Sequence, residues 1–489
     1  MEGKYILGID QGSTGTKVII VDRAGEIVAS AHRPVVSIYP KAGWLEHDAA
    51  ALWDTVAECI TECSEKVDFS QLRAIGITNQ RETVILWDRE TGEALTPAVS
   101  WQCTRSAEIA ERWRPFEKEI GDSTGLNLNP YYSASKVTWL LENDPELRRR
   151  CEAGEVCFGN VNTWVLWKLT GGAHLTDSTN AGRTMFFNVH RNEWDDELLR
   201  RMDIPKAILP EVRPCDDFFG MAVEPREAFA RPVPVLGMIG DQMSALFGQI
   251  CFERGEAKIS LGTCMNLVCF TGRFEEQKLG IIPAIASSLG GELQYEMEGS
   301  TYVAGAVNEW LIEQLRVADS PQEICSLAEQ VESSDGVYFV PAFRGLGTPY
   351  WDDDCRAEIT GLSRAHDRRH VCRAALDGVA LQANDILEAF RQIGVDIQTL
   401  KVDGGLTRSD FAMQNFANIT RCRIERPFNT DRTSMGAVYL AGLASGLWES
   451  QEALKEIWGL DRVFEPEPFE GIEALLEGWE RAVRKARNL

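Results

Sequence analysis

The residues from Asp10 to Lys17 have the types and spacing that could bind the phosphates of a nucleotide. Asp10 is followed by a turn rich in Gly, Ser and Thr (Gln11-Gly12-Ser13-Thr14-Gly15), and apolar runs on either side predict a β-hairpin. Glycines let backbone N–H groups approach an oxyanion closely, and a carboxylate beside them can hold a Mg²⁺ shell against a phosphate. An ordinary hairpin with a polar turn is the alternative, and this fragment alone leaves both open.

Two more sets of polar residues stand where buried strands are predicted to end. Arg81 and Glu82 follow the run Leu72–Thr78, and an adjacent Arg and Glu offer both donors and acceptors to a hydroxylated substrate. Asp241 follows Val233–Ile239 and opens a predicted helix, a position that suits a general base. A solvated ion pair and a plain helix N-cap are the respective alternatives.

The elements that must position these residues repeat along the chain. A second pair of apolar runs, Lys258–Leu261 and Leu267–Phe270, surrounds a Gly262-Thr263 break at the head of the second half. This return of the opening pattern predicts a duplicated domain, with a first domain at 1–249 and a second at 250–489.

Strand hairpins with interleaved helices predict an α/β fold and not a TIM barrel, whose units would alternate one strand with one helix. Val371–Phe390 carries apolar residues at helical spacing and is predicted to be a helix. The Ser/Thr/Asn-rich segment Leu175–Met185 is predicted to be loop or turn.

Composition excludes several classes of function. Asp plus Glu exceed Lys plus Arg by 74 − 50 = 24, which argues against nucleic acid as a partner. No apolar run approaches the ~20 residues of a membrane span, and no signal peptide precedes Gly8, so we expect no membrane insertion. The 13 cysteines contain no CxxC pair and complete no metal site, which indicates buried thiols in a reducing cytoplasm.

Taken together, these motifs resemble the FGGY carbohydrate kinases over essentially the whole chain. The family's first diagnostic pattern runs through Tyr131, Ser133, Lys136, Trp139 and Asn143, and its second through Ala357, Gly361, His370, Ala374 and Asp377. Each fragment is weak alone, but their number and order make chance negligible.

The resemblance implies two actin-like (RNase H-like) ATPase domains with ATP and Mg²⁺ in the cleft between them. Asp10 would organise the metal. The residues expected to bind the nucleotide are Ser13, Thr14, Gly15 and Lys17 from the first domain, and Gly262, Thr263, Gly305, Glu309, Gly405 and Ser409 from the second.

The resemblance also implies phosphorylation of a primary hydroxyl of a small polyol, with glycerol expected first. Asp241 would accept the hydroxyl proton as the oxygen attacks the γ-phosphorus. The residues expected to bind the substrate are Arg81, Glu82, Trp101, Tyr131, Asp241, Gln242 and Asn266.

Departures from the family pattern at four positions matter. Lys17 stands where Arg is frequent, and Glu309 and Ser409 stand where Gln and Asn are frequent. Asn266 stands where the glycerol pocket has a Phe wall, which favours a four- or five-carbon polyol or ketose (erythritol, threitol, xylitol or xylulose type) as the alternative substrate. A small loop shift that presents Met265 in its place would restore an apolar wall.

Two readings from other classes stay open. An actin-like ATPase that moves a protein partner would leave Arg81, Glu82, Tyr131 and Asp241 unexplained, and the intact Asp10 and Asp241 argue against a catalytically dead sensor. The expected partners are therefore ATP and a small polyol or sugar, and the sequence leaves open whether the chain forms a homo-oligomer.

Overall fold

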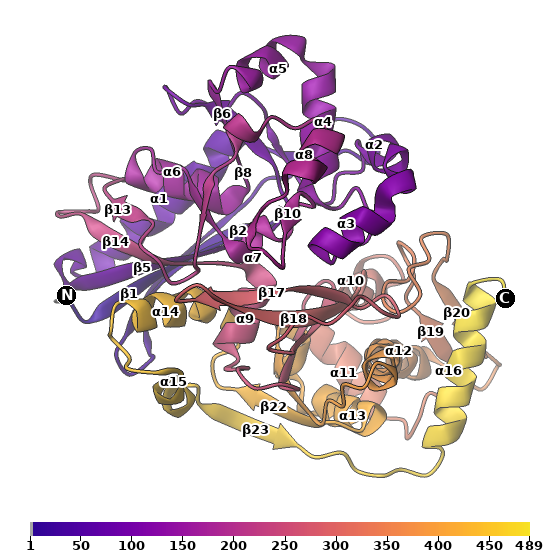
Figure 1. Cartoon of the computed structure of the whole chain (residues 1–489). Helices are drawn as coiled ribbons and strands as arrows, with labels where there is room; N and C mark the ends of the chain where they lie inside the picture. Colours follow the sequence, from indigo (N-terminus) through magenta and orange to yellow (C-terminus); the bar gives the residue numbers. More distant parts are fainter. Residues whose placement is uncertain (1–2) are drawn as a thin grey trace.

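The protein, seen here as a computed structural model that describes residues 3–489, consists of two lobes, one above the other in Figure 1. The first lobe is built on a six-stranded mixed sheet whose central strands are buried on both faces. In spatial order the strands are β13 (Gly220–Ala222), β14 (Val233–Gly240), β5 (Leu72–Asn79), β1 (Tyr5–Gln11), β2 (Gly15–Asp22) and β3 (Ile27–Pro34).

The second lobe repeats this topology on a seven-stranded sheet. Its strands, in spatial order, are β17 (Ile282–Leu289), β18 (Glu292–Thr301), β16 (Met265–Phe270), β15 (Ala257–Leu261), β21 (Thr399–Asp403), β22 (Arg423–Pro427) and β23 (Leu460–Phe464). In both sheets an antiparallel hairpin (β1–β2, β15–β16) is extended in parallel by two strands (β5 and β14, β21 and β22). The predicted α/β duplication is confirmed by this pairing.

Helices cover both faces of each sheet. One face of the first sheet contacts α1 (Ala49–Lys66), whose N-cap Asp48 accepts hydrogen bonds from two backbone amides, and α6 (Val161–Thr170). The other face contacts α14 (Arg432–Ala444), a late segment of the chain that lies directly under the first sheet in Figure 1. Helix α14 in turn packs against α9 (Asp241–Gly248), which contacts the second sheet.

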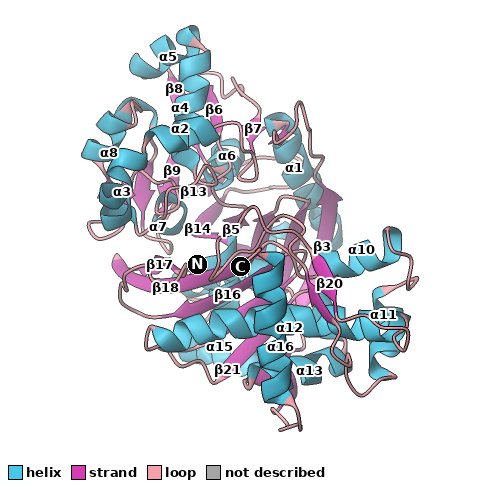
Figure 2. Cartoon of the chain, turned by 90° about the vertical axis from the view of Figure 1, so that its right-hand side faces the viewer, coloured by secondary structure: helices cyan, strands magenta, loops and turns pink. Residues whose placement is uncertain are grey.

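The helices of the second lobe lie on the side of its sheet away from the first lobe (Figure 2). They are α10 (Ala306–Glu313), α11 (Pro321–Glu329), α12 (Arg368–Gln392), α13 (Asp410–Thr420) and α16 (Ile472–Ala486). The predicted helix Val371–Phe390 lies within α12, which begins earlier because Asp367 and His370 form a capping box.

The remaining helices of the first lobe lie above its sheet in Figure 1. The helices are α2 (Ala107–Arg112), α3 (Glu117–Thr124), α4 (Ser133–Asn143), α5 (Pro145–Glu152) and α8 (Asp196–Arg201), and two paired strands are β6 (Ile85–Asp88) and β8 (Val156–Gly159).

The prediction of a loop over Leu175–Met185 is wrong for its first half. This segment begins with strand β9 (Leu175–Asp177) and continues as the short helix α7 (Ser178–Ala181). The Asp177 carboxylate caps α7 by accepting from the Thr179 and Asn180 amides, so the polar residues that suggested a loop form a helix start instead.

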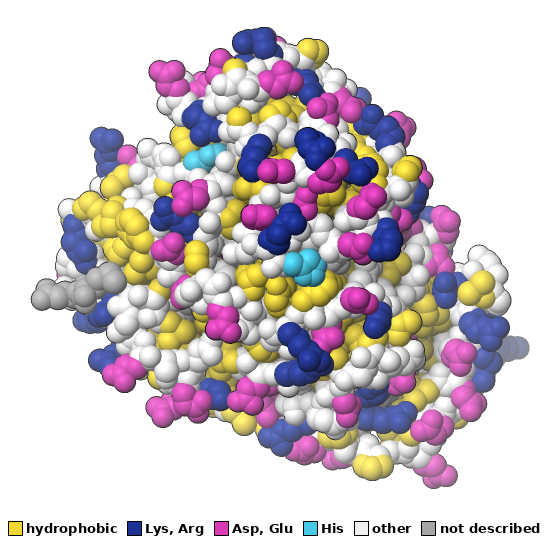
Figure 3. All heavy atoms as spheres, viewed as in Figure 1, with side chains coloured by type: hydrophobic (Ala, Val, Ile, Leu, Met, Phe, Trp, Pro, Cys, Tyr) yellow, Lys and Arg dark blue, Asp and Glu magenta, His cyan; other side chains and the backbone are white. Residues whose placement is uncertain are grey.

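The surface carries mixed charge. On the face drawn in Figure 3, basic and acidic side chains are interspersed over both lobes, without a continuous basic area on that face. Among residues 3–489, no helix is both long enough and apolar enough to cross a bilayer.

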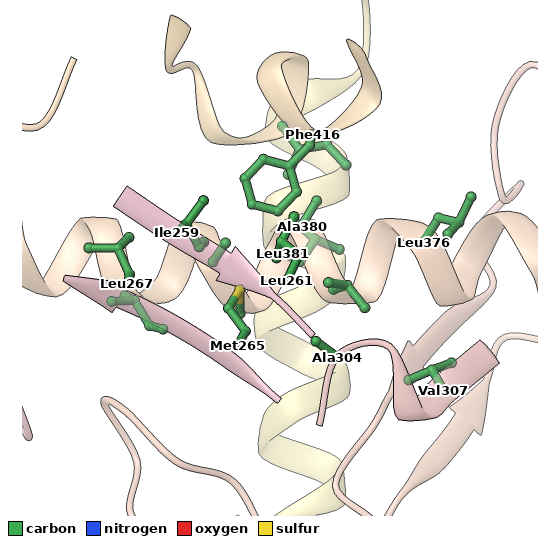
Figure 4. Close-up of a cluster of buried hydrophobic side chains, with 14 of the residues drawn as sticks. Ile259, Leu261, Met265, Leu267, Ala304, Val307, Leu376, Ala380, Leu381 and Phe416 are labelled. Atoms are coloured by element: carbon green, nitrogen blue, oxygen red, sulfur yellow. The ribbon is translucent and has the colours of Figure 1, made fainter. Parts of the chain in front are cut away.

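The core of the second lobe lies between its sheet and α12 (Figure 4). Ile259, Leu261 and Leu267 point toward α12, and Met265 lies among them, fully buried. Because side chains alternate along a strand, Asn266 and Lys258 face the opposite side, toward α9 and the first lobe.

Candidate active site

A cavity of about 490 Å³ lies between the two lobes. It brings together all seven residues that the sequence analysis assigns to the substrate: Arg81, Glu82, Trp101, Tyr131, Asp241, Gln242 and Asn266. Ser13 also lines it, and Ser300, Tyr302 and Arg344 close it from the second lobe. The cavity is therefore made by segments from both halves of the chain.

A buried network of ion pairs forms one wall of the cavity. The Arg81 guanidinium pairs with the Asp241 carboxylate (Nε–Oδ1 2.8 Å) and donates to both oxygens of Glu298 (3.1 and 3.3 Å). Arg183 donates to Glu82 (2.7 Å). Burial alone would raise the pKa of Glu298, but Arg81 and Arg183 outweigh it and hold that pKa at about 2, so the carboxyl is ionised.

The Arg81–Glu82–Thr83 turn holds Glu82 in the left-handed region, at φ 61°. This conformation is uncommon for a residue with a side chain, and the buried ion pair with Arg183 helps to fix it. The strain lies at the point where strand β5 ends, so the Glu82 side chain reaches the cavity and not the sheet.

Trp101 and Tyr131, the two aromatic residues predicted for the site, are oriented by the contacts around them. Trp101 donates from Nε1 to the Ser13 hydroxyl (2.8 Å), and its ring packs edge-on against Tyr131 at 5.1 Å between centroids. The buried Lys136 ammonium on α4 donates to the carbonyls of Pro130, Tyr131 and Tyr132 at 2.6, 2.6 and 3.0 Å. Lys136 thus fixes the loop that presents Tyr131.

Asp10 lies beside the cavity, at the end of β1, in a negatively charged environment. Burial, then the neighbouring carboxylates Asp431 and Asp241, raise the pKa of Asp10 to about 8. Ser434 donates to Asp10 (3.2 Å) and to Asp431 (2.8 Å), and Lys17 forms an ion pair with Asp431. Lys17 therefore lies next to the predicted phosphate turn, and its charge is partly neutralised by Asp431.

The donor set at Asp10 fits a Mg²⁺ ion that is shared with phosphates. Carboxylate oxygens are ligands that Mg²⁺ prefers, and a cation would relieve the repulsion that raises the Asp10 pKa. Within residues 3–489, no three acidic, His or Cys side chains converge closely enough to hold an ion alone. This agrees with how Mg²⁺ is usually bound, by one or two protein carboxylates together with phosphates of the substrate.

The residues predicted to bind the nucleotide from the second lobe lie outside this cavity but close to one another. Gly305 donates its amide to the Gly262 carbonyl (2.8 Å), and a Cβ on Gly404 would meet the Leu261 backbone at 2.5 Å. A Cβ on Gly405 would have no neighbour within 4 Å. Ser409 caps α13, and Glu309 is exposed on the first turn of α10.

The structure adds four charged residues that sequence reasoning missed: Arg183, Lys258, Glu298 and Asp431. Glu298 could have been noticed, because a Glu in a strand with an apolar opposite face is unusual. Arg183 and Asp431 stand far along the chain from Glu82 and Lys17, the residues that they pair with. Lys258 stands inside a predicted strand, so the role of all three appears only in three dimensions.

Comparison with known proteins finds similarity over the whole chain. Models of the N-terminal and C-terminal domains of the FGGY family of carbohydrate kinases match residues 5–248 and 257–445. Glycerol kinase from Bacillus cytotoxicus is 42% identical, covering 99% of both chains, and that from Listeria monocytogenes is 42% identical, covering 100% of this chain and 99% of its own.

Solved structures agree. Plasmodium falciparum glycerol kinase with ADP has a TM-score of 0.93 and 34% identity, covering 99% of each chain. Xylulose kinase from Lactobacillus acidophilus, at 23% identity, has the same fold with a TM-score of 0.90, covering 99% of this chain and 98% of its own.

Proposed function

The chain belongs to the FGGY family of carbohydrate kinases, and from this membership we propose that it transfers a phosphoryl group from ATP to a primary hydroxyl of glycerol. One observation carries the proposal beyond the family: the cavity joins a carboxylate, Asp241, to a set of donors and acceptors that suits a hydroxylated substrate. Specificity for a three-carbon substrate is supported by three of the four relatives compared above, which are named glycerol kinases. The fourth is a xylulose kinase.

The reaction follows from the geometry of the first lobe. Arg81, Glu82 and Tyr131 would hold the hydroxyl groups that do not react, with the Trp101 ring against the substrate carbons. Asp241 would take the proton of the reacting hydroxyl as its oxygen attacks the γ-phosphorus. Two lobes that close on the substrate exclude water, which limits hydrolysis of ATP in the absence of polyol.

Phosphate and metal binding are assigned to the turns at the ends of the two hairpins. Ser13, Thr14, Gly15 and Lys17 would contact phosphates from the first lobe, and Gly262 and Thr263 from the second. Asp10 would hold Mg²⁺, which when bound neutralises the phosphate charge. The adenosine would lie along Gly305, Glu309, Gly405 and Ser409.

We propose a division into domains at 1–249 and 250–489, with α14 of the second domain packed on the sheet of the first. The 13 thiols, none of them in a disulfide among the described residues, support a reducing cytoplasmic location for the enzyme. Whether the enzyme works as a homo-oligomer is a question for size-exclusion chromatography with light scattering.

Polyol-dependent release of ADP in a coupled assay tests the proposed function. We expect turnover only when glycerol or a related polyol is present. Turnover that is independent of polyol would point to an actin-like ATPase, and no turnover with any polyol would point to a non-catalytic sensor.

A four- or five-carbon polyol or ketose is the second candidate substrate, and the position of Asn266 favours it. Asn266 lines the cavity, whereas Met265 is buried in the core of the second lobe (Figure 4), so Met265 does not take the place of Asn266 as an apolar wall. A cavity of about 490 Å³ also falls in the range used for ligands larger than glycerol.

The Asn266→Phe variant decides between the two substrates. If Asn266 leaves room and an amide for a longer chain, the variant raises the ratio of kcat/KM for glycerol to that for erythritol by about 5- to 150-fold. An unchanged ratio would show that Asn266 does not set specificity, and glycerol would then stand alone.

A further inference from the structure

Lys258 is a buried cation of the second lobe that contacts a residue lining the cavity, Gln242. It stands on β15 and its side chain is fully buried, a rare position for a lysine. Its ammonium donates to Gln242 Oε1 at 2.5 Å and to Ser260 Oγ at 2.9 Å. Gln242 belongs to α9 of the first lobe and lines the cavity next to Asp241, so this bond crosses from one lobe to the other at the site.

The bond with Lys258 decides which way the Gln242 amide is oriented. An ammonium group only donates, so the carboxamide must present its oxygen to Lys258. The amide NH₂ then faces away from Lys258 and has no hydrogen-bond partner among residues 3–489. Gln242 therefore offers a hydrogen-bond donor beside the acceptor Asp241. A substrate hydroxyl can use both, because it accepts one hydrogen bond and donates another.

Carboxyl groups on two strands and one helix act on the charge of Lys258. Asp403 on β21, Glu298 and Glu296 on β18, and Asp241 on α9 all act on it. Burial lowers the pKa of Lys258, and these four groups oppose that shift. Lys258 is therefore a fixed point between the two lobes and not a mobile surface residue.

We infer that Lys258 is a positioning residue for phosphoryl transfer: it holds the Gln242 carboxamide with its donors toward the polyol, and it does so only while the second lobe is docked on the first. The inference rests on the proposed function. It means that the lobe expected to carry the nucleotide completes the polyol site of the other lobe, so polyol orientation depends on closure.

Two variants test the inference from opposite sides of the bond. Lys258→Met removes the donor and lets the Gln242 amide turn, so kcat/KM for the polyol should fall about 10- to 100-fold, since a site group loses its partner. Gln242→Glu keeps the contact as an ion pair with Lys258 but has no amide donor. We expect it to fold with undiminished thermal stability and to lose polyol kcat/KM by a similar factor.

The matched control is Lys401→Met. Lys401 is the register neighbour of Lys258 on the adjacent parallel strand β21, but its ammonium donates to the Ile250 carbonyl and not to a cavity residue (3.0 Å). It should keep the wild-type kcat/KM for polyol. The double variant Lys258→Met/Gln242→Glu should lose no more than either single variant, because both remove the same arrangement.

The outcomes separate the inference from the proposed function. A folded Lys258→Met enzyme, or a Gln242→Glu enzyme, with polyol kcat/KM within about three-fold of wild type overturns the positioning role while leaving the kinase intact. A decrease in melting temperature alone, with unchanged kcat/KM, also overturns it, since that is the signature of a purely structural lysine. If Lys258→Met does not fold, Gln242→Glu decides the question. A wild-type enzyme that phosphorylates no polyol overturns the proposed function and the inference with it.

Discussion

The Asp241 carboxylate has its two oxygens in different surroundings. Oδ1 lies 2.8 Å from Arg81 Nε and accepts the backbone amide of Gln242 at 2.7 Å. Oδ2 has no hydrogen-bond partner among residues 3–489, and the side chain is 29% exposed to the cavity. One oxygen is thus held in place while the other remains available to a hydroxyl proton.

Asp241→Asn should reduce kcat by about 10²- to 10⁴-fold, because the carboxamide keeps the shape but cannot act as a general base. The dissociation constant for polyol should rise only a few-fold, from the weakened contact with Arg81. Turnover and calorimetric binding measure the two effects separately.

Asp48→Asn is the matched control for Asp241→Asn, since Asp48 also stands at a helix start but lies outside the cavity. It should leave kcat unchanged. If Asp241→Asn retains turnover within about three-fold of wild type, Asp241 is only the first residue of α9.

Glu296 is a carboxyl group that the proposed mechanism does not use. It is fully buried on β18, and neither oxygen has a hydrogen-bond partner among the described residues. Burial, followed by the neighbouring Glu298, raises its pKa from 4.5 to about 8. Between pH 4.5 and about 8, Glu296 ionises in the unfolded chain but stays protonated in the folded one. The contribution of Glu296 to the free energy of unfolding is therefore fully present below pH 4.5 and is lost as the pH rises to about 8.

Glu296→Gln should remove this loss. The variant should gain stability over wild type progressively between pH 4.5 and 8, reaching on the order of a few kcal/mol. Denaturant unfolding at both ends of this pH range measures the difference, with the exposed Glu292→Gln on the same strand as control. A constant difference across the range would contradict the protonated state of Glu296.

At the residue scale, the sequence predicted side chains that directly follow a strand and missed those that reach the site from far away. Arg81, Glu82 and Asp241 could be predicted because polar residues after apolar runs mark the ends of strands. Lys258 could not, since it stands inside a strand, and Glu298 was missed although a Glu in a buried strand is unusual. Only the pairing of the lobes shows which residues these two contact. The loop prediction for Leu175–Met185 failed because side-chain caps look like turns in composition.

The two crossing helices α9 and α14 set the geometry of the site at the scale of elements. They approach so closely that a Cβ on Gly436 would lie 1.8 Å from the Ser244 carbonyl oxygen. On the other helix, a Cβ on Gly248 would lie 2.1 Å from the Arg432 carbonyl oxygen. Since α9 begins with Asp241 and Gln242, backbone contact between these helices places the end of α9 that carries the proposed general base.

Gly436→Ala should therefore shift α9, lower the free energy of unfolding by about 1–3 kcal/mol and reduce polyol kcat/KM. Gly405→Ala is the contrasting variant, because its Cβ would meet nothing within 4 Å. It should leave the melting temperature unchanged and raise KM for ATP, as expected if nucleotide occupies that space. Equal melting temperatures for the two variants would show that the helices can separate without cost.

At the scale of the whole molecule, two buried polar links join the lobes at the cavity. One is the Lys258–Gln242 bond, and the other is the paired contact of Glu298 with Arg81 and Arg183 (Arg183 Nη1–Glu298 Oε2 3.8 Å). Both start on the second sheet and end on residues of the first lobe that line the cavity. Each of these buried cations faces carboxyl groups, so the two links join the lobes without a local excess of positive charge.

Glu298→Gln should open the molecule. Removing one partner of a buried pair costs about 3–5 kcal/mol, because Arg81 and Arg183 then lack a counter-charge, and separating the lobes would rehydrate them. We expect a larger radius of gyration in small-angle scattering without ligand, together with weaker polyol binding. Saturating polyol should restore the compact form in part, since a ligand at 100 times its Kd contributes about 2.7 kcal/mol, which is less than the cost of the lost pair. Glu292→Gln, exposed at the start of the same strand, should behave like wild type. If the Glu298→Gln enzyme keeps the wild-type radius of gyration and polyol affinity, this ion pair forms when the lobes close but does not stabilise the closed state.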